Sequence, residues 1–500
     1  MFEAAIDAIP IVFTPTRIGF LLLGTMAGVV VGALPGLGGV VGMSILLPFV
    51  FGMETYSGIA LMMGLIAVIH TSDTFPSVLI GTPGSSGAQA TIMDGYPLAQ
   101  KGEASRALGA SFMSSLLGGL FGAAFLFTLL FVARPIVQNL TSPRLFMLGV
   151  LGVCTVGSLM RGSALTGVIS TALGLFLGTV GGAIGAPTYR YTFDTIYLMD
   201  GLPIAIVALA MFGIPELIDL LAGGGAVSDR PPIKGGLMKG VREVFSHKML
   251  VLRSSLVGTA VGFTPGIGAS VVDWLSYGVA ERTVKKPHHF GEGDIRGVIA
   301  PESANNAKEG GALVPTLLFG IPGSATNALL LGGLILLGIQ TGPNMVGADL
   351  PITLSILWTL TIANVFGTLA CMALVIPISK MTGIPGKRIV PFLFVLIAIA
   401  AYQTTAQYGD FLVLGGLAVL GWTMKRAGWP RAPLLIGAVL SKNLERYLSI
   451  SIGRYEYTWL TDPLVLVLAA LSLLIMFGGA RGAAGASSTK KEAKNVESDA

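Results

Sequence analysis

Charged side chains are scarce in this chain. Only 11% of its 500 residues are Asp, Glu, Lys or Arg, whereas 53% are hydrophobic. A soluble domain carries roughly 25% charged residues, so this composition excludes a soluble multidomain protein. Several hydrophobic runs instead reach the roughly 20 residues that a helix needs to cross a bilayer. The clearest are residues 107–133, 163–182, 202–221 and 351–378, with a shorter run at 463–480.

The hydrophobic runs also lack the alternation of apolar and polar residues that a membrane-spanning β-barrel requires. Long unbroken apolar runs are typical of transmembrane helices. We therefore predict an all-α polytopic membrane protein with about ten to twelve transmembrane helices.

Cysteine is almost absent. Cys154 and Cys371 both lie in apolar segments, and two cysteines define neither a disulfide framework nor a zinc site. The histidine pair at residues 288–289 stands beside two lysines, a setting that does not favour a metal ion. We expect no metal centre.

Nucleotide-binding motifs are missing as well. The chain has no phosphate-binding Gly-x4-Gly-Lys-Ser/Thr motif, so we expect no ATP hydrolysis of that type. Gly36 and Gly38 are followed by Val41 where a dinucleotide fingerprint needs its third glycine. No motif for a catalytic acid–base or nucleophile pair is present either. We expect neither a cofactor nor enzymatic activity.

We expect no secretory signal at the N-terminus and no folded structure at the C-terminus. Glu3 and Asp7 stand where a secretory signal would have basic residues. The last segment, residues 481–500, is small, polar and charged, which is typical of a disordered tail.

The net charge of +5 could indicate a nucleic-acid partner, but the basic residues cluster in short segments between hydrophobic runs. Lys and Arg gather in the cytoplasmic loops of membrane proteins and set their orientation. We therefore expect a lipid bilayer, and no nucleic acid, as the surroundings of this chain. The basic segments are residues 230–253, 281–296, 380–388 and 425–431.

An internal repeat is the most informative feature of the sequence. The segment VGALPGLG at residues 31–38 recurs as VGFTPGIG at residues 261–268. Downstream, LIGTPGSS at residues 79–86 recurs as FGIPGSA at residues 319–325. The spacing within the two halves is similar, and a charged insertion near residues 285–294 explains the longer second half.

The basic loops predict the relative orientation of the halves. If residues 94–106 and 230–253 are both cytoplasmic, four spans separate them, and the two repeats enter the membrane from opposite sides. Such inverted repeats are a common plan of secondary transporters. The expected units are an N-terminal segment (residues 1–16), a first membrane repeat (17–222), a basic cytoplasmic linker (223–250), a second membrane repeat (251–450), a final transmembrane helix (451–480) and the tail (481–500).

Each repeated segment contains Pro-Gly inside an apolar run. Proline removes a backbone donor and glycine permits angles that no helix uses, so four breaks predict discontinuous helices or re-entrant hairpins. Freed N–H groups at half-helix N-termini attract anions. A single break would only indicate a kink, but four paired breaks favour a substrate site. Its candidate residues are Pro35, Gly36, Gly38, Thr82, Pro83, Gly84, Ser85, Pro265, Gly266, Gly268, Pro322, Gly323 and Ser324.

Polar side chains near these breaks are candidates for an ion site. Intramembrane polar groups are costly and usually line a pathway. Asn305 and Asn306 could coordinate sodium or cap a helix on a cytoplasmic loop, and Asp73 could join the ion site or cap the helix that follows it. Thr326 follows the last break and completes the set.

The motifs resemble the large permease subunit of tripartite tricarboxylate transporters, the TctA-type family, over almost the full length. The resemblance rests on residues 34–38, on DGYPLAQKG at 94–102, on 290–306 and on 319–324. The segment FGEGDIRG together with PESANN is highly specific. It implies a multi-pass protein of the bacterial inner membrane that works with a small four-helix membrane subunit and a periplasmic solute-binding protein. Uptake of citrate or another di- or tricarboxylate would be driven by Na⁺ or H⁺.

Two departures from the family pattern leave the substrate open. Phe263 and Thr264 stand where members often have a branched aliphatic residue and leucine, and residues 70–76 differ from the glycine-rich form in citrate carriers. A gated anion channel, or a membrane protein without a solute-binding partner, is the alternative, because channels share broken helices.

Overall fold

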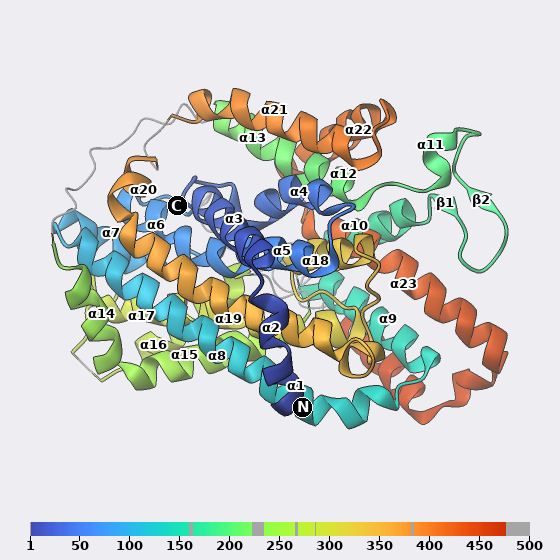
Figure 1. Cartoon of the computed structure of the whole chain (residues 1–500), viewed down its shortest axis with the longest axis horizontal. Helices are drawn as coiled ribbons and strands as arrows, with labels where there is room; N and C mark the ends of the chain where they lie inside the picture. Colours follow the sequence, from blue (N-terminus) through green and yellow to red (C-terminus); the bar gives the residue numbers. More distant parts are fainter. Residues whose placement is uncertain are drawn as a thin grey trace, which may run out of the picture.

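Helices make up nearly all regular structure in the computed structural model, which describes residues 2–159, 164–222, 235–265, 269–285, 287–381 and 385–476 (Figure 1). The described strands are β1 (Gly181–Gly182) and β2 (Tyr189–Arg190), which form one short antiparallel pair. The predicted all-α class is confirmed.

Six helical segments are long and apolar enough to cross a membrane: Pro15–Gly32, Thr55–Ile80, Ala104–Val137, Ile204–Ala222, Leu350–Ala373 and Lys387–Thr405. Shorter apolar helices accompany them at Gly38–Val50, Ser142–Ser158, Ala164–Gly178, Ala325–Leu336 and Pro463–Met476. Many side chains on their outer faces, such as Phe392 and Phe394, are apolar and exposed. This is the surface expected of a protein surrounded by lipid, and the polytopic prediction is confirmed.

The first half of the chain contains α1 (Phe2–Asp7), α2 (Ile9–Val12), α3 (Pro15–Gly32), α4 (Gly38–Val50), α5 (Thr55–Ser72), α6 (Thr74–Ile80), α7 (Thr91–Gln100), α8 (Ala104–Gln138), α9 (Ser142–Leu159), α10 (Ala164–Gly178), α11 (Ile196–Met199), α12 (Ile204–Ala208), the π-helix η1 (Leu209–Gly213) and α13 (Ile214–Ala222).

The second half contains α14 (Leu237–Ser246), α15 (Lys248–Phe263), α16 (Ala269–Thr283), α17 (Ile295–Phe319), α18 (Ala325–Leu336), the 3-10 helix η2 (Pro343–Val346), α19 (Leu350–Ala373), α20 (Val375–Met381), α21 (Gly386–Thr405), α22 (Gly409–Arg426), α23 (Ala432–Tyr455) and the 3-10 helix η3 (Thr458–Thr461).

Glycines fix how the first helices of each half pack. A Cβ on Gly28 of α3 would lie 2.8 Å from the backbone oxygen of Leu65, and one on Gly32 would lie 2.6 Å from that of Ile69. Small residues allow this close backbone approach between membrane helices. Because both positions advance by four residues, α3 and α5 run parallel.

The second half repeats this contact. A Cβ on Gly258 of α15 would lie 2.2 Å from the oxygen of Ala304, and one on Gly262 would lie 2.2 Å from that of Lys308. Helices α15 and α17 therefore run parallel and pack as α3 and α5 do.

The central helices of the two halves run in opposite directions. Nε2 of His70 on α5 lies 3.2 Å from Oε1 of Glu309 on α17, and Oγ1 of Thr74, the first residue of α6, donates to Oε2 of Glu302 on α17 at 3.0 Å. As the residue number rises from 70 to 74, the residue number of the partner on α17 falls from 309 to 302. The α5–α6 segment and α17 are therefore antiparallel where they cross. The two halves are inverted relative to each other, as the sequence predicts.

The second pair of breaks is closed by matching caps. Gly81 has φ +66° and Gly320 has φ +68°, the left-handed conformation that ends many helices. After each glycine, a backbone N–H bonds back to a proline carbonyl, from Thr82 to Pro76 at 3.3 Å and from Ile321 to Pro315 at 3.0 Å. The sequence repeat is therefore also a repeat in the structure, because Pro-Gly follows the end of α6 in the first half and the end of α17 in the second half.

The loops at the starts of α8, α15 and α17 lie together. Arg106 donates through Nε to Oε2 of Glu243 at 2.8 Å, and Nζ of Lys101 donates to the backbone oxygen of Glu292. Oδ1 of Asp94 accepts backbone N–H bonds from Gly291, Gly293 and Asp294. Three basic segments thus share one face, which we call the basic-loop face.

The opposite face holds the start of α3 and the far end of α8. Arg17 at the start of α3 pairs with Glu54 before α5 at 3.1 Å. Arg144, just beyond the end of α8, pairs with Asp462 at 2.9 Å. The first half therefore begins on this face and the second half on the basic-loop face.

The expected domain boundaries stay predictions. Residues 223–234 of the expected linker and residues 477–500 at the end of the chain lie outside the described residues. The described part of the linker forms α14 and the start of α15.

We predict that the basic-loop face is cytoplasmic, because Lys and Arg oppose translocation. Single cysteines at Ser246 on this face and at Ala427 in the basic segment 425–431, which we also expect to be cytoplasmic, occupy exposed positions. Both should resist a membrane-impermeant maleimide in intact cells and react after permeabilisation. A cysteine at the exposed residue Tyr457, near Asp462, should react in intact cells. Periplasmic labelling at Ser246 would contradict this orientation.

Candidate functional site

Ionisable side chains are buried where α5 crosses α17. His70 lies between two carboxylates, with Nδ1 3.4 Å from Oδ2 of Asp73 and Nε2 3.2 Å from Oε1 of Glu309. Nζ of Lys308 lies 2.7 Å from the same Glu309 oxygen. All four residues are almost completely buried. Buried charges persist only when they are paired and hydrogen-bonded, and this chain of contacts meets that condition.

A third buried carboxylate, that of Glu302, joins three helices of the first half to α17. Its Oε2 accepts hydrogen bonds from Thr74 at 3.0 Å and Ser115 at 2.9 Å, and its Oε1 accepts one from Thr91 at 2.7 Å. Nearby, Asp273 of α16 accepts a hydrogen bond from the backbone N–H of Ala90. We call His70, Asp73, Asp273, Glu302, Lys308 and Glu309 the central cluster.

The first and second breaks meet beside Asp73. Ser85 donates a hydrogen bond to Oδ2 of Asp73, and a Cβ on Gly38 would lie 3.5 Å from Cβ of Ser85. A Cβ on Gly84 would lie 2.5 Å from the backbone oxygen of Asp73. Glycine is therefore required at position 84 for the break to lie against Asp73.

The fourth break reaches the same region from the other half. Ser324 caps α18 by accepting from the backbone N–H of Asn327, whose Nδ2 lies 3.2 Å from Oε2 of Glu309. A Cβ on Gly39 would lie 3.1 Å from Oγ1 of Thr326, and one on Gly323 would lie 3.0 Å from the oxygen of Gly262. The first, second and fourth breaks therefore converge.

The remaining predicted substrate residues lie along these breaks. Gly36 has φ +79° and faces open space, since no atom lies within 4 Å of a Cβ built there. Pro35 precedes α4, Thr82 and Pro83 follow α6, and Pro322 follows α17. Pro265 is the last residue described before the third break. Gly266 and Gly268 lie outside the described residues.

Several backbone donors at the breaks are already used within the protein. The N–H of Gly87 donates to Ser85 at 3.1 Å, that of Gly323 to Thr316 at 3.4 Å, and that of Asn327 to Ser324 at 3.2 Å. A carboxylate bound there would compete with these contacts. The expectation that free N–H groups alone hold an anion is weakened for these three donors.

The structure separates the two asparagines that the sequence grouped. Asn305 lies against the second break, with Oδ1 2.7 Å from a Cβ built on Gly87. Asn306 instead donates through Nδ2 to Thr71 at 2.9 Å and to Asn364 of α19 at 3.1 Å. Of the predicted ion ligands, Asp73 and Asn305 flank one loop, whereas Asn306 and Thr326 have other neighbours.

Unpaired polar atoms concentrate around this loop. Within the described residues, Oδ1 of Asp73 and both amide atoms of Asn305 are buried without a hydrogen-bond partner. Buried polar groups are normally satisfied, and each unsatisfied one costs about 1–3 kcal/mol. Two oxygens of this kind beside one loop are suited to coordinate a small cation.

The interpretation of Asn305 and Asn306 as helix caps is wrong. Asn305 and Asn306 lie well inside α17, which begins at Ile295 and is capped by Asp294. Asp73 does stand at the N-cap position of α6, but its backbone angles are helical and its side chain makes no capping hydrogen bond. The polar residues of this segment are buried at a helix crossing instead.

Four residues of this region were not identified as site residues from the sequence, namely Glu302, Glu309, Asp273 and Asn364. One signal was available for the first two: Glu302 and Glu309 stand two helical turns apart in a segment flanked by apolar runs, so they share a helix face. Nothing local marks Asp273 or Asn364, whose partners come from segments far away in the sequence.

The charge balance of the central cluster favours a cation. Four carboxylates face one lysine and one histidine (Lys308 and His70), and charge interactions are strong where water is excluded. Such a site attracts protons or a metal cation more readily than an anion. Among the described residues, no group of three or more His, Cys, Asp or Glu side chains forms a metal site.

Inverted helical units with paired breaks around a buried polar site define a membrane transporter of the inverted-repeat class. The family model for the tripartite tricarboxylate transporter TctA family matches residues 18–436. The chain belongs to this family and is a membrane component of a tripartite tricarboxylate transporter, so the resemblance seen in the motifs is confirmed.

Two curated relatives come from Agrobacterium vitis. An uncharacterized 52.8 kDa protein in the TAR-I ttuC' 3'region is 30% identical over 473 residues, which is 92% of each chain. An uncharacterized protein in the TAR-II ttuC' 3'region is 32% identical over 220 residues, 43% of this chain and 91% of its own length. No solved structure matches the chain.

We predict that Gly84→Val and Gly323→Val each reduce uptake at least tenfold, because the added side chain displaces a break from its neighbour. Ser85→Ala, which removes one hydrogen bond to Asp73, should weaken the apparent affinity for the transported carboxylate by a smaller factor of about two to five. Uptake in vesicles and size-exclusion profiles of the purified proteins measure both effects.

Gly415→Val is the matched control. Gly174, a glycine in another apolar helix, is unsuitable as a control because a Cβ there would lie 1.9 Å from the oxygen of Leu434. Gly415 is exposed on α22 with no atom within 4 Å of such a Cβ. Normal uptake by the Gly84 and Gly323 variants would show that the breaks are only structural kinks and do not form the substrate site.

Proposed function

We propose that this chain is the large permease subunit of a tripartite system that imports citrate or another di- or tricarboxylate by symport with Na⁺ or H⁺. The observation that carries the proposal is the buried, carboxylate-rich central cluster at the crossing of two inverted halves. A site between inverted repeats can be opened to one side and then to the other when the halves rock against each other.

Ion coupling is supported by the atoms beside the second break. Among the described residues, Oδ1 of Asp73 and Oδ1 of Asn305 are buried and unpaired, and a cation would supply the partner that both oxygens lack. Occupation by a cation would also offset the negative charge of Asp73. Ion binding would thereby change the energy of the break that carries Gly84 and Ser85.

The partners follow from the family. A tripartite system has two further components, which we propose to be a small four-helix membrane subunit and a periplasmic solute-binding protein. The apolar helices and the family assignment support a multi-pass protein of the bacterial inner membrane. The chain needs no bound cofactor in this mechanism, because the ion gradient supplies the energy.

We predict that membrane vesicles containing all three components accumulate carboxylate when an inward Na⁺ or H⁺ gradient is imposed. Uptake should saturate, should be the same with and without ATP, and should stop when the gradient is collapsed by an ionophore. Non-saturating flux that ignores both gradients would support the gated anion channel, and accumulation that depends on ATP would exclude symport.

We further predict that Asp73→Asn and Asn305→Ala raise the ion concentration needed for half-maximal uptake at least tenfold. The carboxylate affinity at saturating ion should change much less, because these side chains are assigned to the ion. Ion titrations of initial uptake rates measure the two effects separately. Asp462→Asn, in a peripheral ion pair with Arg144, is the matched control, and an unchanged ion dependence in the Asp73 variant would refute the assignment.

A further inference from the structure

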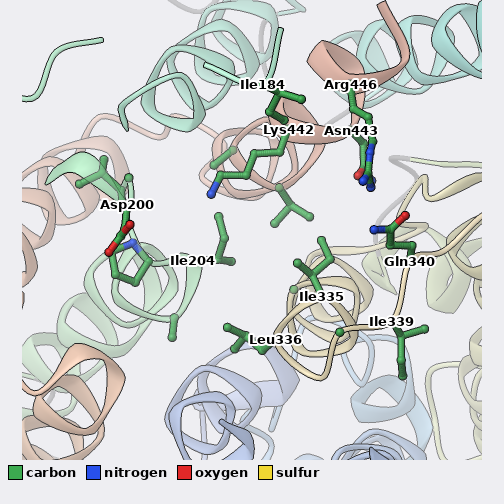
Figure 2. A pocket seen from close by; sticks show the side chains of 18 of the residues that line it. Ile184, Asp200, Ile204, Ile335, Leu336, Ile339, Gln340, Lys442, Asn443 and Arg446 are labelled. Atoms are coloured by element: carbon green, nitrogen blue, oxygen red, sulfur yellow. The ribbon is translucent and has the colours of Figure 1, made fainter. Parts of the chain in front are cut away.

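A cavity of about 870 Å³ lies apart from the central cluster, between both halves of the chain (Figure 2). Its walls come from the loop before α12, the end of α18 with the loop that follows, and the middle of α23. Phe51, which follows α4 and stands near Glu54, also lines it. The cavity therefore lies toward the face opposite the basic loops.

Two cationic side chains border this cavity and have no acidic partner among the described residues. Lys442 and Arg446 lie one turn apart on α23, and Figure 2 shows Lys442 reaching into the space. In the described part of the chain, neither forms an ion pair. Glu445, the carboxylate between them in sequence, is engaged by Arg190 at 2.7 Å. The acidic lining residue is Asp200, so the charge of the lining is positive.

The remaining lining suits an organic anion. Apolar side chains form one wall, among them Ile204, Ile335 and Leu336, and amide groups of Gln340 and Asn443 lie beside the cations. Ligand sites commonly combine apolar walls with a few polar groups that fix orientation. A guanidinium is also well suited to bind a carboxylate through two parallel hydrogen bonds.

The cavity also touches the fourth break. A Cβ on Gly320 would lie 3.0 Å from Oγ1 of Thr341 and 3.2 Å from Nδ2 of Asn443, and both residues line the cavity. The backbone N–H of Gly342 donates to the oxygen of Leu317 at 2.8 Å. Gly320 stands two residues before Pro322, so a ligand in the cavity lies next to the broken segment that leads to Ser324.

We propose that this cavity is a receiving site for the transported carboxylate, held by Lys442 and Arg446 before it passes to the fourth break. This proposal rests on the proposed function and adds to it the location of the anion. The coupling cation and the carboxylate then bind at different places. The cation binds at the carboxylate-rich central cluster, and the carboxylate binds first in the cavity beside Lys442 and Arg446.

The test first measures the anion preference of the cavity without requiring transport. Gln340→Cys places a thiol at an exposed lining position, and the unsubstituted chain, with Cys154 and Cys371, gives the background rate. An anionic methanethiosulfonate should react faster than a cationic one. Lys442→Gln with Arg446→Gln should lower that rate ratio at least tenfold. Arg454→Gln, farther along the same helix and against Tyr455, should leave it unchanged.

Ligand protection identifies the occupant. Citrate and succinate should slow labelling of Gln340→Cys in vesicles of phosphatidylcholine alone, and the double variant should lose this protection. Protection that appears only when phosphatidylglycerol is added would assign the cavity to an anionic lipid and overturn the proposal. A rate ratio that the double variant leaves intact, or an absence of protection by both acids, would overturn it as well.

Uptake then separates this proposal from the proposed function. In vesicles with all three components, the double variant should raise the KM for the transported acid at least tenfold while changing the maximal rate less than threefold. Gradient-driven uptake with an unchanged KM would refute the receiving site and leave symport standing. Absence of gradient-driven uptake in the unsubstituted protein, together with intact anion protection, would refute symport alone.

Discussion

The antiparallel crossing of α5 and α17 is the constraint on which the rest of the structure depends. It buries His70 against Asp73 and Glu309, far from water that could solvate them. An unpaired ionised group in such surroundings is strongly destabilising, and His70 is matched by one carboxylate from its own half and by one from the opposite half. The crossing therefore fixes the relative position of the two repeats as well as the content of the site.

The glycines of α3 and α15 follow from the same constraint. Gly28 and Gly258 let a neighbouring helix approach at backbone distance on the outer side of α5 and α17, respectively. Without a hydrophobic driving force between helices in lipid, close packing of this kind holds membrane helices together. Each half thus forms a parallel pair that holds its polar central helix in place. The Pro-Gly breaks are then held against that pair, as Gly84 is against Asp73.

Separating the cation and the anion gives symport a physical basis. The central cluster is rich in carboxylates, whereas the cavity near α23 presents Lys442 and Arg446, which have no acidic partner among the described residues. An anion and a cation bound at opposite ends of the fourth break would each neutralise charge that the protein leaves uncompensated. Coupling then arises because moving either one alone through the membrane would expose an unpaired charge.

The sequence by itself determined the membrane class, the helical fold and the inverted repeat, because these depend on hydrophobic runs, loop charge and recurring Pro-Gly segments that are all local. It also indicated Asp73 and Asn305 near the breaks. Only the tertiary structure decided which polar groups meet. The bonds from Thr74, Thr91 and Ser115 to Glu302 join segments about two hundred residues apart. The cavity at Lys442 depends on three segments that are distant in the sequence and share no motif. Helix packing brings such residues together, and packing depends on shape and buried charge summed over the whole chain rather than on any one segment.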